Sequence, residues 1–164
     1  MPVTMEGPLK DLSSWKPRYC SIDKALRIVG TRSAMLVLRE AYYGTTRFDD
    51  FVARVEITDA SVAAVLRKLT AAGVLEKVPY KEPGKRRRYE YALTEMGLDL
   101  LPATIALMQW SDKWLQPDGG PLNVSDADGR PVVAQLHNGH STIGLDDLHI
   151  SLNSTWAAHQ TLNL

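Results

Sequence analysis

The chain of 164 residues has a single cysteine, no long hydrophobic run and no net charge. The lone Cys20 cannot close an internal disulfide, which suits a reducing cytoplasm. No stretch approaches the roughly 18 consecutive apolar residues of a membrane helix, and residues 1–10 lack the basic-then-apolar pattern of an export signal. We therefore expect a cytoplasmic protein with no membrane partner.

Motifs of enzymes and metal sites are also missing. The sequence contains no Gly-x4-Gly-Lys-Ser/Thr phosphate loop, no Gly-x-Ser-x-Gly elbow and no His-Glu-x-x-His helix. His137 and His140 flank a glycine turn without a nearby cysteine, and Asp126 and Asp128 lack the closing glutamate of a calcium loop. We expect no enzymatic activity, no cofactor and no metal site.

Equal numbers of acidic and basic residues would argue against a nucleic-acid partner, but the charges are unevenly distributed. Residues 1–115 hold 18 basic and 14 acidic residues, whereas residues 116–164 hold one basic and five acidic residues. Residues 67–94 alone carry eight basic and three acidic residues. Such a local basic face is what phosphate binding requires, whatever the charge of the whole chain.

The domain organisation is predicted from a cluster of turn-forming residues between Gln116 and Pro121. The chain upstream alternates helical patterns with two strand-like runs, whereas the chain downstream has turn signals and few charges. We predict an N-terminal arm (1–18), a central domain (19–115) and a small β-rich extension (116–164). In the extension we expect short strands at 122–125 and 131–136.

Apolar residues at helical spacing predict four helices in the first half of the central domain. In the first of them, Ile22, Leu26 and Val29 form a stripe of the kind that a helix buries. A threonine or aspartate at 58–59 is suited to cap the fourth helix. The predicted helices cover residues 19–29, 33–43, 47–55 and about 59–73.

The fourth predicted helix has two distinct faces. Val62, Val65, Leu66 and Leu69 form its core stripe, and the opposite face carries small residues and cations. Such a face lets a helix approach the major groove of DNA closely, although alanine is also common on solvated helices. The candidate recognition residues are Ser61, Ala64, Arg67 and Lys68.

Two strand-like runs follow this helix, at 74–80 and 87–93, and a Pro83-Gly84 turn joins them. Alternation predicts that Tyr89, Tyr91 and Leu93 face the core. The tip of this hairpin is basic, and directly after a recognition helix it predicts the wing of a winged helix-turn-helix. The candidate wing contacts are Lys85, Arg86, Arg87 and Arg88.

Several motifs resemble the HxlR family of bacterial winged helix-turn-helix transcriptional regulators, which are MarR-like. They are the runs 20–41 and 44–51, Leu-Arg-Lys-Leu-Thr-Ala-Ala-Gly-Val-Leu-Glu at 66–76, Arg-Tyr-Glu-Tyr-Ala-Leu-Thr-Glu-Met-Gly at 88–97, and Leu-Leu-Pro at 100–102. One departure is Thr31-Arg32-Ser33, where many members carry a tryptophan after the basic residue. The resemblance implies a homodimeric regulator, often of genes that respond to small molecules or oxidants.

Residues 94–115 predict a long helix with Thr94 as its cap and with Pro102 as a kink or as the mark of a separate first turn. This helix is apolar on two sides and therefore needs two partners, of which one can be a second subunit. Alternatively, the tail after Gly120 covers the second side. The candidate dimerisation residues are Leu107, Trp110 and Trp114 on the helix and Leu9, Leu12 and Trp15 in the arm.

Cys20 lies near the start of the first predicted helix, with Arg18 and Lys24 close in sequence. A helix dipole and nearby cations favour a reactive thiolate, which would suit a redox sensor. The alternative is a small buried hydrophobic residue. For the C-terminal extension (116–164) we expect one of two roles: it covers an effector pocket near Trp110 and Trp114, or it stabilises a dimer.

The sequence thus predicts an α+β fold, a winged helix-turn-helix with a long C-terminal dimerisation helix and a small β appendage. The predicted function is sequence-specific DNA binding by a homodimeric transcriptional repressor on a pseudo-palindromic operator, under the control of a small molecule or of thiol modification. The alternatives are a winged helix used only for protein contacts and a ligand-binding protein that has lost its affinity for DNA.

Overall fold

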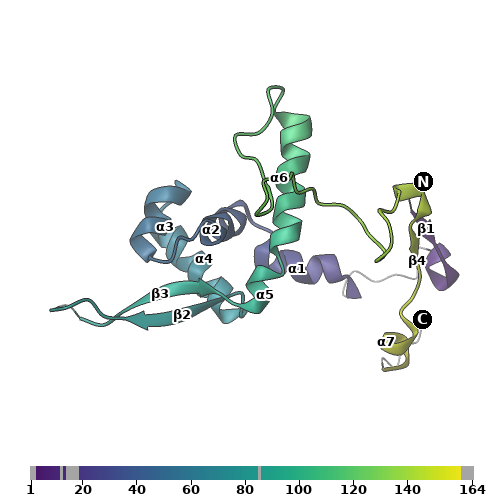
Figure 1. Cartoon of the computed structure of the whole chain (residues 1–164). Helices are drawn as coiled ribbons and strands as arrows, with labels where there is room; N and C mark the ends of the chain where they lie inside the picture. Colours follow the sequence, from purple (N-terminus) through teal and green to yellow (C-terminus); the bar gives the residue numbers. More distant parts are fainter. Residues whose placement is uncertain (1–2, 12, 14–18, 85, 160–164) are drawn as a thin grey trace. The chain divides into compact units, whose positions relative to one another are not determined.

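A computed structural model describes residues 3–11, 13, 19–84 and 86–159 of the chain (Figure 1). It divides into two units. Residues 24–134 form the larger unit, and the smaller unit combines residues 1–23 with residues 135–164. Within the described residues, no helix is long and apolar enough to cross a membrane.

The larger unit is built on three helices, α2 (Arg32–Tyr42), α3 (Phe48–Val55) and α4 (Asp59–Ala71), which pack against one another. Threonines cap two of them: the side chain of Thr31 accepts a hydrogen bond from the Ala34 N–H, and that of Thr58 accepts one from the Ser61 N–H. Each cap satisfies a backbone donor that has no partner inside the helix. The helix starts predicted from the sequence are therefore correct to within one residue.

The core of this unit lies where the three helices meet the first strand of a hairpin. The core stripe predicted for the fourth helix lies in it, with Val62, Leu66 and Leu69 buried and Val65 half-buried. The fully buried side chains are Val37, Leu38, Phe51, Val55, Val62, Leu66, Leu69, Val74 and Leu75.

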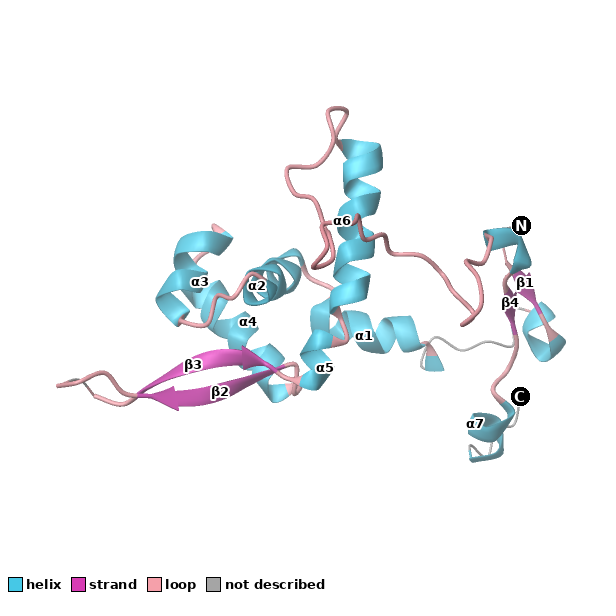
Figure 2. Cartoon of the chain, in the orientation of Figure 1, coloured by secondary structure: helices cyan, strands magenta, loops and turns pink. Residues whose placement is uncertain are grey.

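The hairpin consists of β2 (Leu75–Tyr80) and β3 (Arg88–Leu93), paired antiparallel with Leu75 opposite Leu93 and Tyr80 opposite Arg88. It extends beyond the helices in Figure 2. Tyr91 and Leu93 pack against the core as predicted. The prediction for Tyr89 was wrong, because the outer half of the hairpin runs past the edge of the core and leaves that ring 52% exposed.

The predicted long C-terminal helix is divided in two. A short helix α5 (Glu95–Leu98) with Thr94 as its N-cap precedes α6 (Leu101–Leu115), and Pro102 occupies the first turn of α6. Proline is tolerated in that turn because its missing N–H would have had no partner there. Pro102 therefore begins a helix and does not kink one.

The first helix, α1 (Ser21–Val29), differs from the expectation in what it buries. Only Val29 is buried, whereas Ile22 and Leu26 are 69% and 55% exposed. The stripe follows the helical period correctly, but nothing within the described chain covers it.

The segment after α6 contains no regular strands at 122–125 or 131–136, so this expectation was wrong. A single bridge joins Ser125 to Pro131 across a turn. The side chain of Gln109 on α6 forms hydrogen bonds with the backbone of residues 132–134, in place of the bonds that a neighbouring strand would make. It donates to the Val132 carbonyl oxygen and accepts from the Ala134 N–H.

The smaller unit joins the two ends of the chain. Strand β1 (Thr4–Met5) pairs in parallel with β4 (His149–Ile150), and a ring contact of 5.2 Å connects Tyr19 with Trp156. Its remaining elements are η1 (Gly7–Lys10), η4 (Leu145–Asp147) and α7 (Ser154–His159). These two units divide the chain differently from the three segments predicted, because residues 117–134 remain with α6 and the two termini pair.

Candidate nucleic-acid interface

The outer face of α4 carries the four residues proposed for DNA recognition. Ala64, Arg67 and Lys68 are exposed on the side opposite the buried Val62 and Leu66. Ser61 is half-buried, and its hydroxyl lies 2.9 Å from that of Thr58, so it belongs partly to the helix cap. Arg67 and Lys68 therefore project beyond a helix surface of small side chains, as contact with the edges of bases requires.

The tip of the hairpin is a solvated basic loop. Arg86, Arg87 and Arg88 are exposed, and Lys85 lies outside the described residues. Gly84 has a φ of +73°, the left-handed conformation that the second central position of a type II turn requires. The predicted Pro-Gly turn therefore presents the three arginines at the end of a hairpin that the core anchors.

The hairpin contacts the N-terminal end of α3 at Tyr91 and, nearer its tip, at Tyr80 and Glu82, a feature that the sequence did not indicate. The Tyr91 N–H donates to the Thr46 carbonyl oxygen at 2.8 Å. The guanidinium of Arg47 forms an ion pair of 3.1 Å with Glu82 and lies 4.8 Å from the centre of the Tyr80 ring. These contacts join residues far apart in sequence, and they orient the hairpin relative to the three helices.

A hollow of about 400 Å³ beside these contacts combines cations with tyrosine rings. Arg47, Lys77 and Arg88 line it together with Tyr80 and Tyr89. The Lys77 amino group lies 6.0 Å from the centre of the Tyr89 ring. Asp49 also lines the hollow and Glu82 pairs with Arg47, so acidic side chains balance part of its positive charge.

Glu40 on α2 is the buried charge of this unit, with 5% of its surface exposed. Its carboxylate accepts two hydrogen bonds from the Arg39 guanidinium, at 2.8 and 3.1 Å, and one from the Thr45 hydroxyl at 3.4 Å. Arg54 on α3 lies 3.9 Å away. The burial of Glu40 could not be predicted from the sequence, because helical spacing alone does not show which side of α2 another helix covers.

Apolar side chains remain exposed on α6. Leu107 and Trp110 are each 54% exposed and Trp114 is 63% exposed, so residues 117–134, the part of the tail in the same unit, leave these side chains largely uncovered. Leu9 is buried within its own chain and offers little surface to a second subunit. Leu12 and Trp15 lie outside the described residues.

The structure also describes the surroundings of Cys20 and of the turn at residues 137–140. Cys20 is half-buried and directly precedes α1. His137 and Asn138 belong to a polar turn in which their side chains accept backbone N–H bonds from residues 139–141. Among the described residues, no three histidine, cysteine or acidic side chains lie close enough together to hold a metal ion.

Comparison with known families and sequences agrees with this geometry. A family model described as HxlR-like helix-turn-helix matches residues 28–119. The uncharacterized HTH-type transcriptional regulator Rv3095 of Mycobacterium tuberculosis is 39% identical over 105 residues, which cover 63% of this chain and 65% of that protein. This chain therefore spans slightly less than two thirds of that curated relative.

Solved structures of similar fold include a protein described as a putative transcription factor and a redox regulator. The crystal structure of PA1607, a putative transcription factor, superposes with a TM-score of 0.73 at 31% identity, covering 84% of this chain and 98% of that one. The redox regulator HypR in its oxidized form superposes with a TM-score of 0.52 at 25% identity, covering 57% of this chain and 96% of that one. The likeness to PA1607 thus extends well beyond the residues that the family model matches.

Proposed function

The chain belongs to the HxlR-like helix-turn-helix family, and from this premise we propose that it is a sequence-specific DNA-binding transcriptional regulator that acts as a homodimer. One observation carries the proposal. The exposed face of α4, with Arg67 and Lys68, is followed directly by a hairpin with three exposed arginines, and both rest on the same core. Major-groove recognition and phosphate binding need these two surfaces on one rigid support.

The roles of the two surfaces differ. Alanines around Arg67 let the backbone of α4 approach the edges of the bases, where a guanidinium pairs with two acceptors of guanine. The hairpin arginines extend away from the helices and suit the phosphates or the narrow minor groove beside them. In this arrangement α4 supplies sequence preference, whereas the hairpin supplies affinity that depends little on sequence.

The homodimer is proposed from the uncovered apolar faces of two helices. Ile22 and Leu26 on α1, and Leu107, Trp110 and Trp114 on α6, stay exposed in the single chain. A second copy that buries such faces removes large apolar side chains from water, at about 25 cal/mol per Å². Two recognition helices about 34 Å apart would then match a pseudo-palindromic operator.

As a dimer on an operator, the protein would act as a repressor by occluding the promoter, and a small molecule would relieve or strengthen its binding. Cys20 is the one thiol available for redox control. Iodoacetamide should label it in the folded protein if it is a sensor. An unlabelled thiol would assign Cys20 to packing.

A gel shift with the full chain and the DNA flanking its own gene tests the proposed function. We expect a saturable complex that contains two copies of the chain and that weakens steeply as salt rises, since several phosphate contacts release counterions. Sedimentation of the free protein should show a dimer. Failure to bind any duplex at low salt would refute DNA binding and favour a winged helix used for protein contacts.

A further inference from the structure

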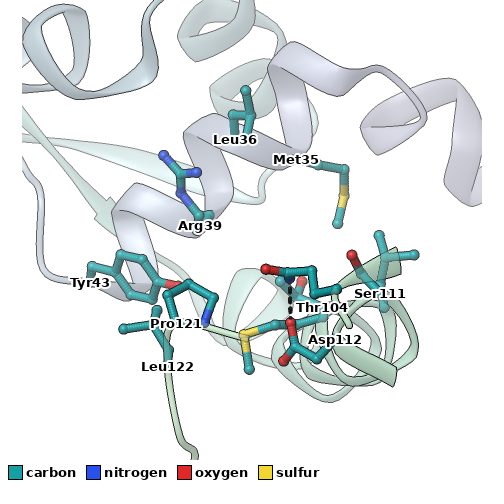
Figure 3. A pocket seen from close by; sticks show the side chains of 12 residues that line it. Met35, Leu36, Arg39, Tyr43, Thr104, Ser111, Asp112, Pro121 and Leu122 are labelled. Carbon is teal, nitrogen blue, oxygen red and sulfur yellow. Dashed lines mark hydrogen bonds between the residues drawn. The ribbon is translucent and has the colours of Figure 1, made fainter. Parts of the chain in front are cut away.

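An apolar cavity of about 420 Å³ lies between α2 and α6 in the larger unit. Met35, Leu36 and Arg39 of α2 line it together with Thr104, Ser111 and Asp112 of α6, and Figure 3 shows Met35 directed toward α6. Leu122, from the segment after α6, closes one end. Two adjoining hollows, of about 370 and 450 Å³, share Met108 and Leu122 with it.

This cavity is distinct from the pocket expected beside Trp110 and Trp114, because neither tryptophan lines it. It opens on the side of α6 that faces α2, whereas the two tryptophans are exposed to solvent. The proposed dimer face and the cavity are therefore neighbouring surfaces of one helix, and Leu107 borders both.

The positive charge in the cavity wall already has an acidic partner. The Arg39 guanidinium donates to the Glu40 carboxylate at 2.8 Å, and the Asp112 carboxylate accepts a hydrogen bond of 2.8 Å from the side chain of Gln116. The Asp112 carboxylate also lies directly against Gly120, so it helps to hold the turn after α6. An anionic ligand would therefore find no uncompensated positive charge here and would lose its hydration on entry.

The rest of the wall suits an uncharged molecule. Met35, Leu36, Leu107, Met108, Pro121 and Leu122 supply apolar surface, and the hydroxyls of Thr104 and Ser111 offer hydrogen bonds. Methionine side chains adapt to ligands of different outline. A volume of this size falls within the range of small-molecule sites, which are mostly apolar with a few polar groups.

We propose that this cavity binds an uncharged, largely apolar ring compound that carries a hydrogen-bonding oxygen, and that it is the effector site of the regulator. The second half of this proposal rests on the proposed function. The position of the cavity explains how occupancy reaches DNA. Helix α2 packs on α3 and α4, and α6 carries the proposed dimer face, so a ligand between α2 and α6 acts on both the recognition helix and the dimer.

Met35 and Leu36 connect the wall of the cavity to the apolar core, and Arg39 connects it to a buried charge. Arg39 lines the cavity and bonds to Glu40, whose carboxylate reaches Thr45 and Arg54. A ligand that displaces the Arg39 side chain removes a hydrogen-bond partner of the buried Glu40 carboxylate. The contacts of Glu40 with Thr45 and with Arg54 on α3 must then rearrange. Such coupling gives the effector different affinities for the free and the DNA-bound conformations, as linkage requires.

The test uses 2-naphthol as an uncharged two-ring probe and 2-naphthoate as its anionic counterpart, titrated by calorimetry into the full chain without DNA. We expect one saturable 2-naphthol site per chain and binding of 2-naphthoate that is weaker by about tenfold or more. Leu122→Trp fills the end of the cavity, and Leu136→Trp is its matched control, since both leucines are 50% exposed and only Leu122 lines the cavity. We expect Leu122→Trp to weaken 2-naphthol binding by about tenfold and Leu136→Trp to leave it unchanged.

Each outcome decides a part of the proposal. Absence of saturable 2-naphthol binding, or equal binding by both variants, overturns the site, and equal binding of 2-naphthoate overturns the charge assignment. Operator affinity is then measured with saturating 2-naphthol, which should change it in the wild type and not in Leu122→Trp. Saturable binding with unchanged operator affinity would overturn the effector role alone, whereas loss of DNA binding in the absence of probe would be a failure of the proposed function.

Discussion

The hydroxyl of Tyr42 donates a hydrogen bond of 2.7 Å to the carbonyl oxygen of Gly97 and so joins the end of α2 to α5. Gly97 is itself buried, and its backbone lies against the carbonyl oxygen of Val74 at the start of the hairpin. One contact thus links the three-helix core, the hairpin and the entry to α6. These are the parts whose relative positions the proposed regulator needs.

The stability of the protein should fall at alkaline pH because of Tyr42. Burial raises the pKa of Tyr42 above its ordinary value of about 10, and a hydrogen bond with Thr104 offsets this in part. The folded state therefore holds the phenolic proton more tightly than the unfolded state does. The stabilisation is complete below about pH 10 and is lost as pH rises through the folded pKa. The free energy of unfolding, measured with urea between about pH 9 and 11, should decline less steeply with pH for Tyr42→Phe than for the wild type. Tyr43→Phe, which changes an exposed tyrosine, is the control. Parallel curves for Tyr42→Phe and the wild type would contradict this prediction.

Gly97→Ala should destabilise the larger unit. An added Cβ would meet the Val74 carbonyl oxygen, a backbone group that cannot move without shifting the start of the hairpin, and would lie 3.0 Å from Cδ2 of Leu93. We expect a loss of about 1–3 kcal/mol in the free energy of unfolding, measured by urea denaturation. Gly144→Ala is the control, because its added Cβ meets only the end of the Asp147 side chain. Equal stability of the two variants would show that α5 adjusts at no cost.

Neutralising Arg86 and Arg87 together should weaken binding to every duplex alike. Both side chains are exposed at the hairpin tip, where phosphate contacts carry no sequence information. The slope of log affinity against log salt should fall by about 2 in magnitude for the double glutamine variant, as measured by fluorescence anisotropy. A loss confined to the operator would instead make the arginines base-reading residues.

Arg67→Gln should alter sequence preference. An arginine on the outer face of α4 can pair with one base, so its removal should cost the operator about 1–3 kcal/mol and cost an unrelated duplex much less. A competition assay against operators substituted one base pair at a time locates the position at which discrimination is lost. Lys24→Gln, which removes an exposed cation from α1, serves as the control. Uniform weakening across all duplexes would refute base recognition by Arg67.

Trp110→Glu should convert the dimer to monomers. The substitution places a charge in the centre of an apolar face that the proposed dimer removes from water. Sedimentation velocity should show a slower species, and operator affinity should fall because one recognition helix contacts only half of the site. Leu136→Glu changes a leucine of similar exposure away from α6 and should remain dimeric. A dimeric Trp110→Glu protein would exclude this face.

In the larger unit, the sequence predicted correctly those features that depend only on neighbouring residues. The Thr58 cap, the buried stripe of Val62, Leu66 and Leu69, and the Pro83-Gly84 turn depend on residues within a few positions of one another. Caps, helical spacing and turn geometry act over that range, so the pattern of residue types predicts them. The outward direction of Arg67 and Lys68 follows from the same helical spacing.

Tertiary structure alone decided which surfaces are covered and which distant groups meet. The spacing of Ile22 and Leu26 is that of a buried stripe, yet both are exposed, while Glu40 is polar and buried. The pairing of Arg47 with Glu82, the bond from Tyr42 to Gly97 and the cavity between α2 and α6 each join residues more than thirty positions apart in the chain. Local patterns determine where each helix and strand forms, because its hydrogen bonds and apolar face arise from neighbouring residues. Burial, charge pairing and cavities depend instead on how these elements pack together, and no local pattern encodes those contacts.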